Sequence, residues 1–192
     1  QYTIQQALRD GYRRIAVHSG HSTGKSYVAA DLVLWFKKAF PGSKILTTAP
    51  TADQVDNILW RTIRQRYHGA RVNLGGTMYD GTARWDFGGD EFALGRSTDK
   101  PVRLQGYHGK YLMVLMDEAA GISPEIWDAV TRLATGRHNY IVAIGNPGPP
   151  EGPFYEACVE NPAWQSIHLD SMDHPNVLCG EELVPGAATR EW

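Results

Sequence analysis

A glycine-bearing turn between an apolar run and an amphipathic segment constrains this chain more than any other feature. The run Ile15-Ala16-Val17 is typical of a buried strand, and the following turn ends in Gly24-Lys25-Ser26. Beyond the turn, apolar residues recur at helical spacing; they are Val28, Ala29, Leu32, Val33, Trp35, Phe36 and Ala39. Strand, glycine turn and helix in this order are the layout of a phosphate-binding loop. The sequence therefore predicts an α/β protein that binds a nucleotide's phosphates through backbone amides, a helix N-terminus and a lysine.

The predicted loop departs from the usual pattern at one point. Its members are Ser19, Gly20, His21, Ser22, Thr23, Gly24, Lys25 and Ser26. A second glycine is expected at the position of Ser19, and here Gly20 stands next to it. We expect Lys25 to contact the β- and γ-phosphates, where negative charge grows during hydrolysis. The alternative is a Gly/Ser turn with a solvated lysine, which the flanking strand and helix disfavour.

Composition excludes several classes of protein. A chain of 192 residues with 42% hydrophobic and 21% charged residues is typical of one globular domain. No apolar run approaches the ~20 residues that a membrane span needs, so no membrane partner is expected. Two cysteines, Cys158 and Cys179, argue against a disulfide scaffold and are typical of a reducing cytoplasm. The net charge of −2 indicates that any contact with nucleic acid is local.

Apolar runs alternate with helical stretches along the rest of the chain. Strands are predicted over residues 44–49, 111–116, 140–144 and 166–169, and helices after Thr51, from Ser123 to near Gly136 and after Pro153. Residues 71–98 differ, because glycine turns separate short aromatic and β-branched pieces, which predicts a small antiparallel meander. The alternation predicts a mostly parallel sheet covered by helices on both faces, with ligands at the carboxyl ends of its strands.

An acidic pair follows the apolar strand that ends at Met116. Ionised carboxylates beside a buried strand are costly unless a partner or a metal uses them. We predict that Asp117, with the hydroxyl of Ser26, holds Mg²⁺, and that Glu118 polarises the attacking water as general base. In the alternative, Asp117 only starts the next turn and Glu118 is solvated.

The segment Gly145-Asn146-Pro147 follows the next predicted strand. Its position beside the acidic strand favours a role in sensing the γ-phosphate and coupling hydrolysis to movement. The alternative is a turn that merely reverses the chain. A cluster of arginines, Arg61, Arg64, Arg66 and Arg71, follows the second predicted strand, and the sequence does not separate a solvated helix face from a contact with DNA or a neighbouring subunit.

These motifs resemble the N-terminal ATPase domain of the large subunit of tailed-phage terminases. The resemblance covers most of the chain. It is carried by residues 19–26, Thr48-Ala49-Pro50-Thr51 with Gln54, Leu104-Gln105-Gly106, the run from Val114 to Ala119, and Gly145-Asn146-Pro147 followed by Gly152-Pro153-Phe154-Tyr155. Two departures stand out: His21, Ser22 and Thr23 replace an arginine often found inside the loop, and Gln105 replaces an arginine often found before the glycine at 106.

The resemblance implies a RecA-like P-loop fold that uses ATP and Mg²⁺. It also implies a homo-oligomeric ring that docks on the portal protein of a procapsid in the host cytoplasm, works with the terminase small subunit and drives double-stranded DNA inward. Arg103 is the candidate for an arginine acting on a neighbour's nucleotide. Residues 1–172 are then the ATPase domain, and residues 173–192 begin a linker towards a nuclease domain of ribonuclease H type.

Two other functions stay open at this point. A helicase-like translocase shares the acidic motif, although it needs a second RecA-like lobe. A non-motor switch or scaffold binds ATP and scarcely hydrolyses it. Glu118 separates the motors from the switch, because a switch needs no positioned base.

Overall fold

The computed structural model describes residues 2–97 and 106–191. The strands are β1 (Arg14–Ser19), β2 (Lys44–Thr48), β3 (Thr77–Met78), β4 (Arg84–Asp86), β5 (Phe92–Gly95), β6 (Leu112–Met116), β7 (Asn139–Gly145) and β8 (Gln165–Leu169). The α-helices are α1 (Tyr2–Arg9), α2 (Lys25–Ala39), α3 (Trp60–His68), α4 (Pro124–Leu133), α5 (Pro153–Tyr155) and α6 (Pro175–Cys179). Two π-helical segments, η1 (Gln54–Leu59) and η4 (Glu156–Glu160), and two 3-10 turns, η3 (Ala119–Gly121) and η5 (Ser171–Asp173), connect them.

The strands form a single sheet in the order β3-β4-β5-β2-β6-β7-β1-β8. The pairs from β5 to β8 are parallel, whereas β3, β4 and β5 pair antiparallel. The predicted meander is therefore confirmed, and it extends the main sheet because β5 also pairs with β2. The predicted RecA-like α/β fold, a mostly parallel sheet with flanking helices, is confirmed as well.

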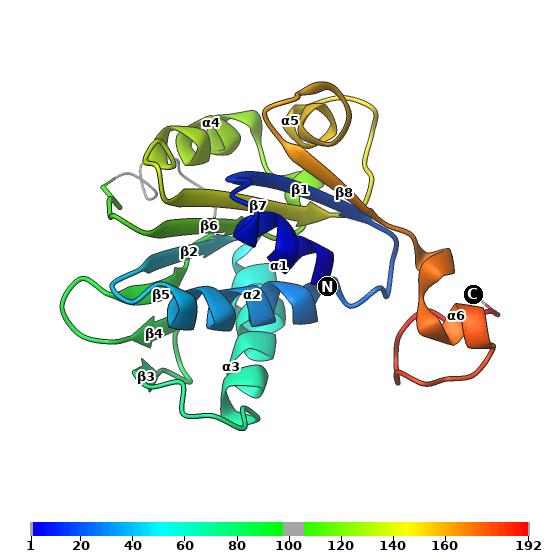
Figure 1. Ribbon diagram of the computed structural model, residues 1–192, viewed down its shortest axis with the longest axis horizontal. Helices are drawn as coiled ribbons and strands as arrows, with labels where there is room; N and C mark the ends of the chain where they lie inside the picture. Colours follow the sequence, from blue (N-terminus) through cyan, green and yellow to red (C-terminus); the bar gives the residue numbers. More distant parts are fainter. Residues whose placement is uncertain (1, 98–105, 192) are drawn as a thin grey trace.

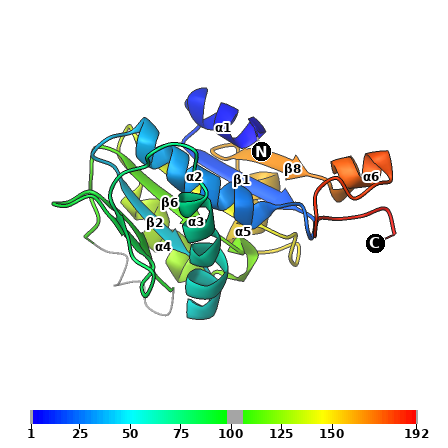
Figure 2. The same ribbon diagram turned by 90° about the horizontal axis from the view of Figure 1, so that it is seen from below.

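Helices cover both faces of the sheet, as Figures 1 and 2 show. On β1, Ile15 and Val17 belong to the core under α1, α2 and α3, while Ala16 belongs to the core under α4 and α5. This alternation follows from the two-residue period of a strand. Both faces of β1, β2, β6 and β7 are buried, which explains why these segments read as continuous apolar runs.

The segment leading into α3 begins with a reciprocal cap. The backbone N–H of Gln54 donates to the Thr51 hydroxyl at 3.2 Å, and the backbone N–H of Thr51 donates to the Gln54 side chain at 3.1 Å. This is the capping-box arrangement, which satisfies backbone donors at a helix start. The helix predicted after Thr51 is therefore confirmed, and η1 and α3 pack beside α2.

The C-terminal part projects beyond the end of the sheet (Figure 1). After β8, the chain forms η5 and α6, and the backbone N–H of Ala188 donates to the carbonyl oxygen of Ser22 at 3.0 Å. Ala188 is buried. Part of the segment predicted as a linker thus lies on the predicted phosphate loop, a contact that the sequence did not indicate; a linker towards another domain stays a prediction.

Candidate nucleotide site

Three loops that carry the predicted site residues come together because their strands are neighbours. The order β6-β7-β1 puts the carboxyl ends of three parallel strands side by side. The acidic pair follows β6, residues 145–147 end and follow β7, and residues 19–26 run from the end of β1 into α2. In a parallel sheet, this edge is where ligands bind.

The predicted phosphate loop is tightly wound around its lysine. Lys25 is the first residue of α2, and its Nζ donates to the carbonyl oxygen of Gly20 at 2.7 Å. Gly24 has φ of 84° and Ser22 has φ of 54°, so both lie in the left-handed region. Glycine adopts this conformation readily, whereas for Ser22 it is strained. The hydroxyls of Ser19 and Thr23 are hydrogen-bonded to each other below the loop.

A hydrogen-bonded chain links the loop to the predicted sensor. The Nζ of Lys25 donates to Asn146 Oδ1 at 2.5 Å, and Asn146 Nδ2 lies 3.2 Å from His21 Nδ1. Burial lowers the pKa of Lys25, and the negative charges of Glu118 and then Asp117 oppose this shift. The acidic pair therefore acts on the same ammonium group that Asn146 contacts.

The acidic pair occupies a sharp turn after β6. Asp117 is only 3% exposed; burial, and secondarily the charge of Glu118, raises its pKa to about 6. Its backbone N–H donates to Thr48 on β2 at 2.8 Å, and its Oδ1 accepts from the backbone N–H of Glu118 at 3.1 Å. Glu118 has φ of 47°. Such strain in a non-glycine residue costs about 1–3 kcal/mol and is common at functional sites.

Glu118, Lys25 and Asn146 line a common cavity of ≈ 410 Å³. Its remaining lining residues are His21, Ser22, Thr23, Gly24, Ser26, Tyr27, Thr62, Pro185, Gly186 and Ala187. This cavity, called the phosphate cavity below, contains most of the predicted loop. Ser19, Gly20, Asp117 and Gly145 lie outside its lining, and Pro147 lines a separate cavity of ≈ 190 Å³ with residues 148–155.

Ser26 and Asp117 carry oxygen atoms of the kinds that bind magnesium. Mg²⁺ prefers oxygen ligands, typically one or two carboxylates with waters and phosphate oxygens. Asp117 supplies a carboxylate whose ionised form burial disfavours, so a cation near it relieves that cost. Ser26 supplies a hydroxyl at the first turn of α2. Across residues 2–97 and 106–191, no group of three or more His, Cys, Asp or Glu side chains forms a metal site.

Two of the four arginines in the predicted cluster make contacts within the chain. Arg66 makes a bidentate pair with Asp31, at 2.8 and 3.0 Å, and Arg64 donates to the backbone carbonyls of Tyr79 and Thr82, both at 3.0 Å. These two arginines hold α3 against α2 and the β3–β4 turn. Arg103, the candidate trans-acting residue, lies outside the described residues, as does Gln105.

The sequence did not indicate several of the residues that line the phosphate cavity. Tyr27 and Thr62 reach the phosphate cavity from α2 and α3, and residues 185–187 reach it from the C-terminal segment. Gly20 packs closely against η5: a Cβ added there would lie 1.9 Å from the Ser171 hydroxyl oxygen, so a larger residue would force that side chain to move. Within the described part of the chain, no helix is both long and apolar enough to span a membrane.

The strand order and the flanking helices define an α/β fold of RecA-like type. No protein-family profile matches the chain. A curated relative, named a probable terminase large subunit, from Enterobacteria phage P7, is 26% identical over 173 residues, which are 80% of this chain and 33% of the relative. The chain thus spans about a third of the length of this relative.

Several solved structures of phage large terminases have the same fold. The ATPase domain of the Thermus phage P74-26 large terminase has a TM-score of 0.70 and 21% identity, covering 88% of this chain and 81% of that one. The large terminase of another thermophilic bacteriophage, in complex with ADP, has a TM-score of 0.60 and 17% identity, covering 86% and 42%. The HK97 large terminase has a TM-score of 0.63 and 12% identity, covering 92% and 41%. The resemblance to the ATPase domain of terminase large subunits is confirmed in sequence and in fold.

Proposed function

We propose that this chain is the ATPase domain of a phage terminase large subunit, and that it hydrolyses ATP with Mg²⁺ to drive double-stranded DNA into a procapsid. One observation carries the proposal: Lys25, Glu118 and Asn146 come from three adjacent strand ends and line the same cavity. A thermophilic-phage terminase that has the same fold binds ADP, which supports a nucleotide as the ligand.

Each residue then has a distinct part in the reaction. Backbone amides of residues 20–26 and the N-terminus of α2 bind the phosphates, and Lys25 neutralises charge on the β- and γ-phosphates. Ser26 and Asp117 would hold Mg²⁺, which supplies electrostatic stabilisation of the phosphate oxygens when bound. Glu118 accepts a proton from the attacking water. Residues 145–147 report on the γ-phosphate through Asn146.

The observed contacts favour this function over the two alternatives. A switch that scarcely hydrolyses ATP needs no carboxylate in the phosphate cavity, yet Glu118 lines it beside Lys25. The relatives reported above are terminases, which favours a packaging motor over a helicase-like translocase. A homo-oligomeric ring on the portal protein, with the small subunit as a partner in the host cytoplasm, completes the proposal by resemblance.

Replacing Lys25 by alanine tests the nucleotide site. We expect Lys25→Ala to abolish measurable MgATP binding in calorimetric titration, because it removes the ammonium that faces the phosphates. Lys38→Ala is the matched control, since Lys38 is an exposed lysine near the other end of the same helix. Unchanged affinity in Lys25→Ala would remove this residue from the site and end the proposal.

If the protein works as an oligomer, its rate of ATP hydrolysis should depend on protein concentration. If a neighbouring subunit supplies an arginine to the phosphate cavity, hydrolysis per molecule rises with protein concentration, because association completes the site. Steady-state phosphate release is measured across a range of concentrations that spans assembly, followed in parallel by light scattering. A rate per molecule that stays constant while the protein associates contradicts a shared site.

A further inference from the structure

A second, larger cavity adjoins the phosphate cavity on the side of β8. It has a volume of ≈ 960 Å³ and shares Thr23, Gly24, Tyr27, Pro185 and Ala187 with the phosphate cavity. Its other lining residues are Thr3, Asp31, Arg66, His168, Leu169, Asp170, Asp173, His174, Pro175 and Val184. We call it the β8-side cavity. Because the two cavities have walls in common, a ligand longer than a triphosphate can extend from one into the other.

The order of the strands gives a bound nucleotide its direction. Glu118 and Asn146 follow β6 and β7, which lie on one side of β1, whereas β8 lies on the other side. A γ-phosphate placed for hydrolysis faces Glu118. The remainder of the nucleotide therefore runs past Lys25 and the start of α2 towards β8, which is the direction of the second cavity.

The charges of the two cavities agree with this direction. The phosphate cavity holds Lys25 and the N-terminus of α2, both of which attract anions. In the β8-side cavity, Arg66 is already paired with Asp31, and the two carboxylates that follow β8, Asp170 and Asp173, add negative charge. Carboxylates repel phosphate groups and accept hydrogen bonds from sugar hydroxyls. The β8-side cavity thus suits the uncharged half of a nucleotide.

Tyr27 offers a surface for a base where the two cavities meet. It lies in the first turn of α2, two residues after Lys25, and is 54% exposed. An exposed aromatic ring beside a phosphate site is able to stack with a nucleobase, because every base has a π-face. Pro185 lines both cavities with it and is apolar.

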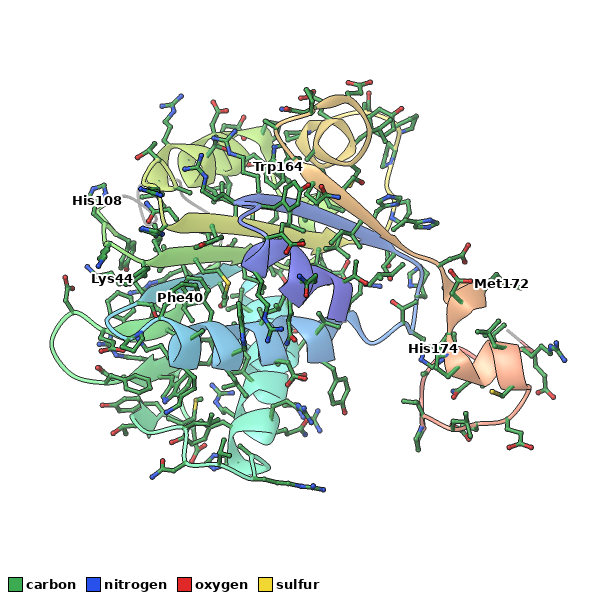
Figure 3. All side chains as sticks on the ribbon, in the orientation of Figure 1. Phe40, Lys44, His108, Trp164, Met172 and His174 are labelled. Carbon is green, nitrogen blue, oxygen red and sulfur yellow. The ribbon has the colours of Figure 1, made fainter. Side chains whose placement is uncertain are left out.

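The C-terminal wall of these cavities is held in place by specific bonds. Asn176, which is 1% exposed, donates through Nδ2 to the Val184 carbonyl and accepts through Oδ1 from the Val184 N–H, both at 2.8 Å. Ala188 then bonds to Ser22 of the phosphate loop. Figure 3 shows His174 and Met172 on this projecting segment. Residues 184–188 are therefore fixed at both ends, on α6 and on the loop.

We propose that the nucleoside half of the bound nucleoside triphosphate occupies the β8-side cavity, with its base against Tyr27 and Pro185, so that residues 184–188 form part of the nucleotide site. This inference rests on the proposed function, because it requires the phosphates to lie at Lys25. It assigns a binding role to a segment that the sequence marks only as the start of a linker.

Comparing MgATP with magnesium tripolyphosphate tests the assignment, because the second ligand lacks the nucleoside. We expect Tyr27→Ala to weaken MgATP binding about 10-fold in calorimetric titration. Its affinity for tripolyphosphate is expected to match that of the wild type. Tyr79→Ala, at an exposed tyrosine on the loop between β3 and β4, is the matched control and leaves both affinities unchanged.

Three results distinguish a failure of this inference from a failure of the proposed function. Wild-type affinity of Tyr27→Ala for MgATP overturns the nucleoside site while leaving the phosphate site intact. An equal loss for both ligands overturns it too, because the tyrosine then supports the loop and not the base. If the wild-type protein binds neither ligand, the proposed function fails and the inference falls with it.

Hydrogen exchange tests the C-terminal wall without any substitution. We expect MgATP to slow amide exchange across residues 184–188 more than magnesium tripolyphosphate does, at saturating concentrations of each. Residues 185–187 also line the phosphate cavity, so both ligands reach the wall there, and in the proposal the nucleoside adds contacts from the β8-side cavity. Equal exchange with the two ligands shows that residues 184–188 do not meet the nucleoside, and overturns their part in the site.

Discussion

Glu118→Gln is expected to lower ATP hydrolysis by about 10²-fold or more while nucleotide affinity stays near that of the wild type. The substitution keeps the size of a side chain that lines the phosphate cavity with Lys25 and Asn146, but the amide does not accept a proton. Phosphate release in steady state measures the first effect, and titration with MgATP measures the second.

The control for this variant is Glu160→Gln, at an exposed position where η4 ends. It is expected to hydrolyse ATP at the wild-type rate. Undiminished turnover in Glu118→Gln would show that Glu118 is not the general base, and would reopen the interpretation of the chain as a nucleotide-dependent switch. Loss of binding together with turnover would instead assign Glu118 a role in holding the nucleotide.

Asp117→Asn is expected to stabilise the nucleotide-free protein by about 3 kcal/mol at neutral pH and to abolish magnesium-dependent hydrolysis. Burial raises the pKa of Asp117 from 3.8 to about 6, and a shift of this size corresponds to about 3 kcal/mol of cost for keeping the carboxylate ionised. The amide has no charge to bury, yet it is a poorer magnesium ligand. Urea unfolding in the presence of a chelator measures the stability.

The sign of this effect sets its pH dependence. Because the folded-state pKa of Asp117 is higher than its ordinary value, ionisation destabilises the folded protein fully above pH ~6, and the cost disappears as the pH falls towards ~4. The stability difference between Asp117→Asn and the wild type should follow the same course. Asp128→Asn, an exposed carboxylate on α4, should stay within about 0.5 kcal/mol at every pH. A difference that does not change with pH would contradict the burial of a charged Asp117.

The strands and helices around the site were predictable because their sequences carry strong periodic signals. The run from Leu112 to Met116 is apolar at every position, as a strand buried on both faces requires, and Thr51 with Gln54 marks a helix start in two residues. The alternation of strands and helices predicts parallel strands, and parallel strands place the residues that follow them at one edge of the sheet. Lys25, Glu118 and Asn146 are therefore close together once the strand order is known. Their chemical roles stay predictions.

The C-terminal part was not predictable by the same means. Residues 173–192 contain prolines and glycines and no long apolar period, so local pattern alone favours an open linker. Their placement depends on long-range bonds instead: a buried Asn176 that holds Val184, and an Ala188 N–H that reaches Ser22 across the sequence. Helix α1 was missed for a related reason, because its eight residues are too few for a secure helical pattern.

The ammonium of Lys25 has three N–H donors, and Gly20 and Asn146 already accept from two of them. A triphosphate that takes hydrogen bonds from this ammonium through both its terminal and its middle phosphoryl groups must displace one of the two acceptors. Asn146 directly follows β7, so its displacement on ATP binding would break the hydrogen bond that joins the end of β7 to the loop after β1. Release of the cleaved phosphoryl group would restore the hydrogen bond between Lys25 and Asn146. The cycle would then begin again, and it would need no groups other than these side chains and backbone atoms.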